Sequence, residues 1–260
     1  MISSVLVTGS NRGIGLELIK KFIAKSQPPK KIFAACRNPD GPRSEELRDL
    51  ASKHSNIVLL PLDVTDTDSV KGAVVEVEKH VKDSGLNLLI NNAGVMPHVN
   101  LDKVDADDMI DTFKTNVVGP MQVSQAFYPL LKKSAESNAQ KDLGYQRAVL
   151  LNVSSLLGSI EQTSLTFNVE LQAISYRISK LLFFPQAALN MLTRLQAESY
   201  KKDGVLCTAI HPGWVKTEMG TEKATLTTDE SATGIMEVLS SLSEKHNGIL
   251  VNWEGSVIPW

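Results

Sequence analysis

The chain has 260 residues, of which 42% are hydrophobic and 22% charged, and its formal net charge is -2. This composition is ordinary for a globular protein and supplies enough apolar material for a sizeable core. The nearly balanced charge and the lack of a basic stripe argue against a nucleic-acid-binding protein.

The first predicted elements enclose a glycine-rich turn. An apolar run ending at Thr8 predicts a strand, and apolar residues at helical spacing from Leu16 to Ile23 predict a helix. Between them lies Gly9-Ser10-Asn11-Arg12-Gly13-Ile14-Gly15. Backbone N–H groups at a helix start attract anions, and a Cβ in place of a glycine hydrogen would block the approach of a pyrophosphate. The order predicts a phosphate site, although a plain glycine turn in a β-α unit has the same spacing.

Strand and helix patterns then alternate along the rest of the chain. Strands are predicted at residues 31–36, 57–62, 86–90, 148–153, 205–210 and 249–251. Helices are predicted at residues 44–53, 66–83, 107–133 and 228–244, and residues 134–142 as a surface loop. The third helix has a candidate break at Gly119-Pro120. Apolar strands separated by helices indicate parallel pairing with both faces covered. We predict an α/β fold, one doubly wound (Rossmann) domain over residues 1–260, with a mostly parallel seven-stranded sheet and helices on both faces.

The sequence shows no sign of export or of a membrane span. The N-terminus enters the first strand without a charged lead or a cleavage site, so we expect no signal peptide. The apolar run at 181–184 is far shorter than the roughly 18–20 residues of a membrane span, and no other run approaches that length. Cys36 and Cys207 lie in predicted strands and are expected to be buried free thiols, which favours a reducing compartment. We therefore expect a cytoplasmic protein.

One tyrosine and one lysine have a spacing that suits acid–base chemistry. Tyr176 and Lys180 are four residues apart, on one face of a helix. A nearby ammonium favours the phenolate and lowers the pKa of a tyrosine from its free value near 10. An isolated pair of this kind is usually a surface contact, so its meaning depends on the other motifs.

Those motifs occur in a specific order. The order is Thr8-Gly9-x-x-x-Gly13-x-Gly15, Asn91-Asn92-Ala93-Gly94, Asn116, Ser154-Ser155, Tyr176-x-x-x-Lys180 and Pro212-Gly213. The set resembles the short-chain dehydrogenase/reductase family over nearly the whole chain. Within that family, segments 8–13, 35–38 and 211–217 look most like the sniffer-like and C-factor-like carbonyl reductases.

The resemblance implies a catalytic site of four residues. Tyr176 would donate a proton to the carbonyl oxygen in reduction and remove it in oxidation. Lys180 would lower the pKa of Tyr176 and hold the nicotinamide ribose. Ser155 would hydrogen-bond the reacting oxygen, and Asn116 would bind a water that links Lys180 to solvent. Ser154 is expected to be structural.

The resemblance also implies a dinucleotide site. Residues Gly9 to Gly15 would hold the pyrophosphate. Asp63 and Val64 would meet the adenine; Asn92, Ala93 and Gly94 would line the ribose, with Asn91 bracing its strand; Val215 and Thr217 would contact the carboxamide. After the second strand, a carboxylate suits NAD, whereas an arginine suits the 2′-phosphate of NADP. Arg37 stands there, with Arg12 as a second base, so we expect NADP(H); a solvated loop arginine is the alternative.

The sequence departs from the family in two places. The segment 156–175, between Ser155 and Tyr176, is longer than usual and is expected to form one wall of the substrate pocket. The family usually follows its lysine directly with a small-residue run like 187–192, whereas Leu181-Leu182-Phe183-Phe184-Pro185-Gln186 stands between them here. A true insertion and a stretch retained from a mis-spliced transcript both fit. Because Pro185 disfavours a helix interior, we expect a break or bulge between Leu181 and Gln186 and a restart near Ala187.

We therefore expect an NADPH-dependent oxidoreductase that reduces a ketone or aldehyde to an alcohol. The alternatives are a non-catalytic dinucleotide-binding regulator on the same fold, and an NAD-dependent alcohol or steroid dehydrogenase. The expected partner is a small carbonyl compound, with no nucleic acid and no membrane, and the expected assembly is a homodimer or homotetramer. No metal is expected, because the five histidines lack metal-ligand spacing.

Overall fold

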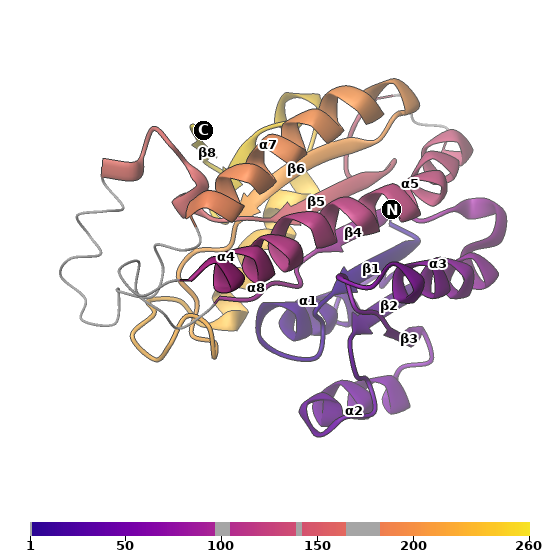
Figure 1. Cartoon of the computed structure of the whole chain (residues 1–260). Coiled ribbons are helices and arrows are strands. Elements are labelled where there is room, and N and C mark those ends of the chain that lie inside the picture. The colour runs from indigo at the N-terminus through magenta and orange to yellow at the C-terminus, as the bar shows by residue number, and fades with distance from the viewer. Residues whose placement is uncertain (1, 97–104, 139–141, 165–182) are drawn as a thin grey trace.

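A largely parallel sheet forms the centre of the protein in this computed structural model, which describes residues 2–96, 105–138, 142–164 and 183–260 (Figure 1). Within these ranges the sheet has eight strands, in the spatial order β3-β2-β1-β4-β5-β6-β7-β8. The strands are Ser4–Thr8 (β1), Lys31–Cys36 (β2), Ile57–Pro61 (β3), Leu88–Asn91 (β4), Val149–Val153 (β5), Leu206–His211 (β6), Leu250–Asn252 (β7) and Val257–Ile258 (β8). Neighbouring strands from β3 to β7 are parallel, and β8 runs antiparallel to β7. The predicted α/β fold is confirmed, and the two-residue β8 was missed because it is too short to leave a pattern.

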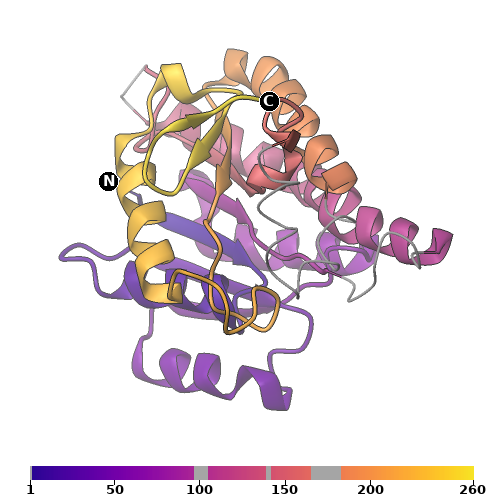
Figure 2. The same ribbon diagram turned by 90° about the vertical axis from the view of Figure 1, so that its left-hand side faces the viewer.

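Helices cover both faces of the sheet (Figure 1 and Figure 2). On one face, α1 (Gly13–Ile23) and α8 (Thr228–Ser241) share an apolar core with the sheet, which Leu47 of α2 (Glu45–Lys53) joins. On the other face lie α3 (Thr67–Val81), α5 (Gly119–Ser137) and α7 (Phe183–Tyr200). Because both faces are covered, every residue of β1 and β4 is buried, which explains why these strands do not alternate between apolar and polar residues.

The strand order reverses direction between β1 and β4. In doubly wound sheets, the carboxyl ends of the strands at this point form the crevice where ligands bind. β1 leads into the glycine turn at Gly9, and β4 leads into Asn92-Ala93-Gly94. The topology therefore brings two of the predicted site motifs to one edge of the sheet.

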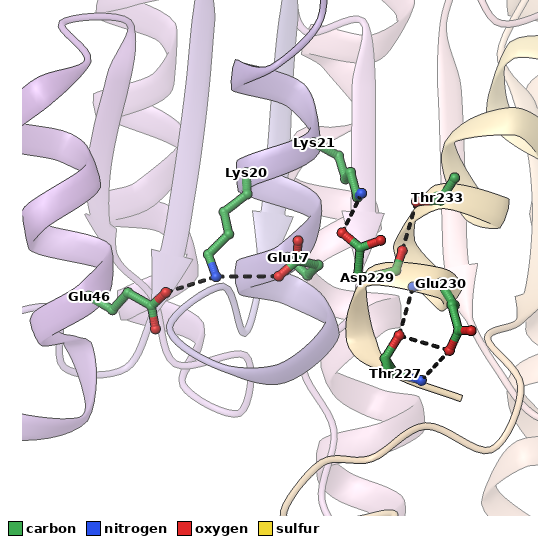
Figure 3. Close-up of polar contacts among 8 residues, drawn as sticks. All are labelled: Glu17, Lys20, Lys21, Glu46, Thr227, Asp229, Glu230 and Thr233. Carbon is green, nitrogen blue, oxygen red and sulfur yellow. Dashed lines mark hydrogen bonds and ion pairs between the residues drawn. The ribbon is translucent and has the colours of Figure 1, made fainter. Parts of the chain in front are cut away.

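A reciprocal helix cap and an ion pair fix the start of α8 (Figure 3). The hydroxyl oxygen of Thr227 accepts a hydrogen bond from the N–H of Glu230 at 3.1 Å, and the Glu230 carboxylate accepts one from the N–H of Thr227 at 2.8 Å. Lys21 of α1 contacts Asp229 at 2.6 Å. Such a capping box defines where a helix begins, so it also defines where the long loop from β6 ends.

Most predicted boundaries lie within a few residues of the observed ones. Asp66 caps α3, and its carboxylate accepts hydrogen bonds from the N–H groups of Asp68 and Ser69 at 2.9 and 3.3 Å. The prediction of a loop from residue 134 was wrong over 134–137, because α5 continues to Ser137.

The predicted long helix changes its winding instead of breaking. α4 (Ala106–Phe113) passes through a π-helical segment, Lys114–Val118, directly into α5. Pro120 lies in the first turn of α5, where a proline is tolerated. A π-helical turn inside a helix frequently lies at a functional site, and this one contains Asn116.

The expected restart of the catalytic helix near Ala187 was wrong. Among the described residues, α7 begins at Phe183, so residues 183–186 form a regular helical turn. Pro185 lies in that turn. Leu181 and Leu182 lie outside the described residues. Within the described part of the chain, no helix has the length and apolar character that would let it cross a bilayer.

Candidate active site

The glycine turn after β1 has the geometry of an anion cradle. Gly9 and Gly13 have φ angles of +66° and +54°. Residues that carry a Cβ atom rarely adopt such positive φ angles. A Cβ on Gly15 would lie 2.3 Å from the carbonyl oxygen of Gly9. Arg12 is the N-cap of α1 and no side chain caps this helix start, so its first N–H groups are available to an anion. The turn thus fits a pyrophosphate.

Side chains at this edge hold the turn in place. The hydroxyl oxygen of Thr8 accepts hydrogen bonds from the N–H groups of Asn92 and Ala93, both at 3.0 Å. The Asn92 side-chain amide donates to the carbonyl oxygens of Thr8 and Gly9 at 2.9 and 3.2 Å. The hydroxyl of Ser10 donates to the carbonyl oxygen of Ala35 at 3.0 Å and is fully buried. The contacts of Asn92 and Ser10 therefore position the turn.

The two remaining predicted residues of the turn, Asn11 and Ile14, contact other parts of the chain. Ile14 is half-buried and packs against the core under α1. The Asn11 amide donates to the carbonyl oxygen of Arg43 at 3.3 Å, which ties the turn to the 3-10 turn η1 (Pro42–Ser44).

Three arginines gather beside the turn. Arg12 and Arg37 were predicted to do so, and η1 adds Arg43. The pKa of Arg12 is lowered, by burial first and then by the nearby charges of Arg43 and Arg37. Glu218 forms ion pairs with Arg12 and, at 3.7 Å, with Arg43. This cluster suits a phosphate group.

Asp63, at the end of the β3 segment, lies within reach of the charge of Arg37. Its carboxylate accepts hydrogen bonds from the N–H and the hydroxyl of Thr65 at 2.9 and 2.8 Å. Burial acts to raise the pKa of Asp63, but these hydrogen bonds and the charges of Arg37 and Lys114 outweigh it, so that the pKa is lowered. Val64 is buried, and a Cβ on Gly119 would lie 2.8 Å from its side chain, so this side chain packs against the start of α5.

Asn116 lies in the π-helical segment and uses its side chain to hold the chain after β4. Its Oδ1 accepts a hydrogen bond from the N–H of Val95, and its Nδ2 donates to the carbonyl oxygen of Val95, both at 2.9 Å. A Cβ on Gly94 would lie 3.4 Å from Asn116 Oδ1. Both side-chain groups of Asn116 are thus bonded to Val95, and each has one further hydrogen-bonding position.

The two serines after β5 have different surroundings. Ser154 is buried, and its hydroxyl lies 3.0 Å from Gln186 Oε1 and 2.6 Å from Asn190 Oδ1, as expected for a structural residue. Ser155 is half-buried, and its hydroxyl oxygen accepts a hydrogen bond from the N–H of Leu157 at 3.1 Å. The structure describes no acceptor for the hydroxyl hydrogen of Ser155, which can therefore donate to a ligand.

A buried polar network lies beneath these serines. The Asn91 amide donates to Ser124 and to Asn152 Oδ1 at 3.0 and 2.9 Å, so Asn91 braces its strand as expected. The Asn152 amide donates to Thr193 and Gln196 of α7, both at 2.9 Å. These bonds favour one register of α7 on the sheet, because a shift of the helix would leave the buried Asn152 amide without its acceptors.

The loop between β6 and α8 folds over the glycine turn. Val215 is buried and pairs with Leu226 across the loop. A Cβ on Gly13 would lie 3.3 Å from the methyl group of Thr217, so the loop touches the turn. Val215 and Thr217 are thus held at the sheet edge where the cofactor site was predicted.

A cavity of about 390 Å³ opens near Ser155. Its lining includes Leu156, Gln162, His211, Trp214 and Trp253. Burial lowers the pKa of His211 to about 4, and its Nδ1 has no hydrogen-bond partner among the described residues. The long segment after Ser155 contributes Leu156 and Gln162, in line with the predicted pocket wall.

The structure leaves two predicted catalytic residues untested and adds three residues to the site. Tyr176 and Lys180 lie outside the described residues. Arg43, Gln186 and Glu218 were not predicted, because each reaches the site through contacts between distant segments. The basic character of the loop after β2 was the one local signal for Arg43.

Residues 3–227 match the family model described as short chain dehydrogenase. The chain belongs to this family. Like other short-chain dehydrogenases, the protein is therefore an oxidoreductase.

This short-chain dehydrogenase is similar to solved structures over its whole length. It is 45% identical to the NADPH-bound carbonyl reductase from chicken fatty liver, with a TM-score of 0.92, covering 100% of this chain and 99% of that one. It is 37% identical to the carbonyl reductase Sniffer of D. melanogaster, with a TM-score of 0.90 and 100% of both chains covered. It is also 34% identical over 176 residues to C-signal of Myxococcus xanthus, covering 67% of this chain and 93% of that protein. The predicted family and the likeness to sniffer-type enzymes are confirmed.

Proposed function

We propose that this short-chain dehydrogenase is an NADPH-dependent carbonyl reductase that converts a ketone or aldehyde into an alcohol. The observation that carries the proposal is the cluster of Arg12, Arg37 and Arg43 beside an uncapped glycine turn, in a chain 45% identical to a carbonyl reductase solved with NADPH. An NAD-dependent dehydrogenase would need a carboxylate after β2 for the ribose hydroxyls, and the residues there are Arg37 and Asn38.

The chain's residues fit the parts of NADPH in turn. The glycine turn and the first N–H groups of α1 would hold the pyrophosphate, and Arg12, Arg37 and Arg43 the 2′-phosphate. Asp63 and Val64 would border the adenine, and Asn92 to Gly94 the ribose. Val215 and Thr217 would contact the carboxamide. When bound, NADPH supplies the hydride for the carbonyl carbon.

The protein would supply the proton and hold the oxygen. Ser155 has a hydroxyl hydrogen to donate to the carbonyl oxygen, which stabilises the charge that develops there. Tyr176 would donate the proton, and Lys180 would lower the pKa of Tyr176 and bind the ribose. Asn116 would hold a water that links Lys180 to solvent, while its side chain is bonded to Val95. The cavity at Leu156 offers the substrate a partly apolar pocket.

Replacement of the proposed acid tests the reaction. The unmodified protein should oxidise NADPH in a panel of ketones and aldehydes, measured as loss of absorbance of the reduced cofactor. Tyr176→Phe should abolish turnover and leave the NADPH dissociation constant nearly unchanged. Tyr145→Phe is the matched control, because the Tyr145 hydroxyl is buried without a partner among the described residues. Turnover by Tyr176→Phe equal to that of the parent would exclude Tyr176 as the acid.

One observation favours a second candidate, a non-catalytic dinucleotide-binding regulator. In α7, the residue directly before Ala187 has its side chain beside Ser154. This residue is Gln186 and not a lysine. An amide cannot lower the pKa of a tyrosine as an ammonium does. NADPH binding by a protein that reduces nothing in a broad carbonyl panel would support the regulator.

A further inference from the structure

The loop from Pro212 to Thr227 carries a carboxylate into the arginine cluster. Glu218 follows Thr217, the residue that touches Gly13 in the glycine turn. It forms ion pairs with Arg12 and Arg43, which come from two other segments of the chain. Glu218 thus connects two parts of the predicted cofactor site. It joins the loop at the nicotinamide end to the arginines at the adenosine end.

The loop from Pro212 to Thr227 is held together by its own hydrogen bonds. The N–H of Lys216 donates to the carbonyl oxygen of Leu226 at 2.7 Å, and the N–H of Leu226 donates to that of Trp214 at 3.0 Å. The Trp214 indole N–H donates to the carbonyl oxygen of Gly220 at 2.8 Å. The capping box at Thr227 anchors the end of the loop (Figure 3). Glu218 is therefore presented to the arginines by an ordered loop.

The ion pairs of Glu218 are accessible to water. The side chains of Glu218, Arg12 and Arg43 are 61%, 49% and 69% exposed. Exposed pairs are weak, so a stronger anion can displace the carboxylate. The 2′-phosphate of NADPH is such an anion, because a phosphate monoester carries a charge of about -1.5 to -2 at neutral pH, against -1 for a carboxylate.

We propose that Glu218 competes with the 2′-phosphate of NADPH for Arg12 and Arg43, and thereby tunes the affinity for NADPH without affecting that for NADH. This inference rests on the proposed binding of NADPH. In the free protein, Glu218 offsets part of the positive charge of the cluster and ties the loop to it. A 2′-phosphate takes over the two arginines and leaves Glu218 as a like charge beside it. NADH lacks this phosphate and leaves the Glu218 pairs intact.

The experiment compares Glu218→Gln with Glu222→Gln. Both variants remove one negative charge from the same exposed loop, but Glu222 has no ion pair among the described residues. Dissociation constants are measured by fluorescence titration with NADPH and NADH, and by competition with adenosine 2′,5′-bisphosphate and ADP. Glu218→Gln should tighten binding of NADPH and adenosine 2′,5′-bisphosphate by roughly two- to five-fold at low salt, the range of an exposed ion pair. NADH and ADP binding should not change, and the gain should shrink at high salt because exposed charges are screened.

Each other outcome contradicts a specific claim. Weaker NADPH binding by Glu218→Gln would show that Glu218 orients Arg12 for the phosphate, and would overturn the competition. The same gain in NADPH affinity in Glu222→Gln would show that the effect comes from the net charge of the loop and not from the ion pairs of Glu218. NADPH binding with equal constants in all three proteins would overturn the inference alone. No binding of NADPH by the unmodified protein would overturn the proposed function itself, and this inference with it.

Discussion

Deletion of residues 181–186 would change which side chain lies beside Ser154. In α7 that place is held by Gln186, whose Oε1 lies 3.0 Å from the Ser154 hydroxyl. Six residues advance an α-helix by about 9 Å and about 1.7 turns, so this segment determines which residues reach the site from α7. The deletion joins Lys180 directly to Ala187, and Lys180 then takes the helical position of Gln186. Tyr176, four residues earlier, follows on the same helix face.

We expect the deletion to keep or increase carbonyl reduction. A positioned acid contributes about 10²–10⁴-fold to a rate, so kcat/KM with NADPH should rise by up to that factor if the parent holds Tyr176 out of place. The stability cost should be small. One neutral hydrogen bond, from Ser154 to Gln186, is lost at about 0.5–1.5 kcal/mol, while Asn190 still lies 2.6 Å from the Ser154 hydroxyl. Removing Phe184, whose side chain is 61% exposed, should raise the melting temperature and reduce aggregation.

Gln186→Lys is the matched control for the deletion. It places an ammonium beside Ser154 but leaves Tyr176 at its original distance along the chain, so it should not increase turnover. Both variants and the parent are compared by steady-state kinetics with NADPH and by thermal unfolding. A deletion protein that is several kcal/mol less stable and less active than the parent would refute the reasoning. The six residues would then belong to the working fold.

Three further predictions concern the cofactor, pH dependence and the core. Arg37→Asp should narrow or reverse a preference for NADPH over NADH, by roughly ten- to a hundredfold, the worth of a charge-assisted hydrogen bond; equal affinity of the parent for both dinucleotides would contradict it. His211 has a folded pKa of about 4 against about 6.5 unfolded, so the unfolded state binds more protons between these values and stability falls as the pH is lowered through them. Between pH 7 and pH 5 this amounts to about 2 kcal/mol in urea unfolding, and His211→Asn should lack that part of the loss. Asn152→Ala should cost about 3–5 kcal/mol, because it leaves Gln196 Oε1 without its donor, removes one of the hydrogen bonds of Thr193 and opens a cavity; a loss under 1 kcal/mol would show that the network is dispensable.

Most of the fold was predictable from the sequence because β1 to β7 are mostly apolar runs and the helices repeat apolar residues at helical spacing. The two-residue β8 was too short to predict, and the end of one helix was missed because polar residues face inward there. Residues 134–137 were predicted as a loop, yet Ser134 is buried and bonded to Asn87 and to the carbonyl oxygen of Arg147 at 2.6 and 3.2 Å. A polar residue satisfied by distant partners looks like a surface residue in the sequence.

The site was predictable where its chemistry is local. The glycine turn and Arg37 belong to short motifs, whose geometry follows from neighbouring residues. Glu218 and Arg43 meet only because η1 and the loop after β6 converge on the same turn. Asn92 and Asn116 were expected to line the ribose and to bind a water, which stay predictions; the structure adds that their side chains bond to the backbone of the site. Sequence shows that an amide is present, whereas its partners depend on the folded chain.

The residues proposed for the phosphates of NADPH and the proposed proton donor lie in different parts of this chain, and this separates the candidate functions. The glycine turn, the arginine cluster and the bracing bonds of Thr8 and Asn92 come from segments that the structure describes, and none of them involves the segment 181–186. A rearrangement of that segment should therefore keep most of the affinity for NADPH and change only the proposed contact of Lys180 with the ribose. Turnover, in contrast, is proposed to need Tyr176 and Lys180 near Ser155, and the six residues before Ala187 would set their register. Dissociation constants of NADPH measured for the parent and the deletion variant separate a change in binding from a change in the register of the proposed catalytic pair. A parent that binds NADPH and is silent, beside a deletion variant that reduces carbonyls, would identify the parent as a dinucleotide-binding regulator built on a reductase fold.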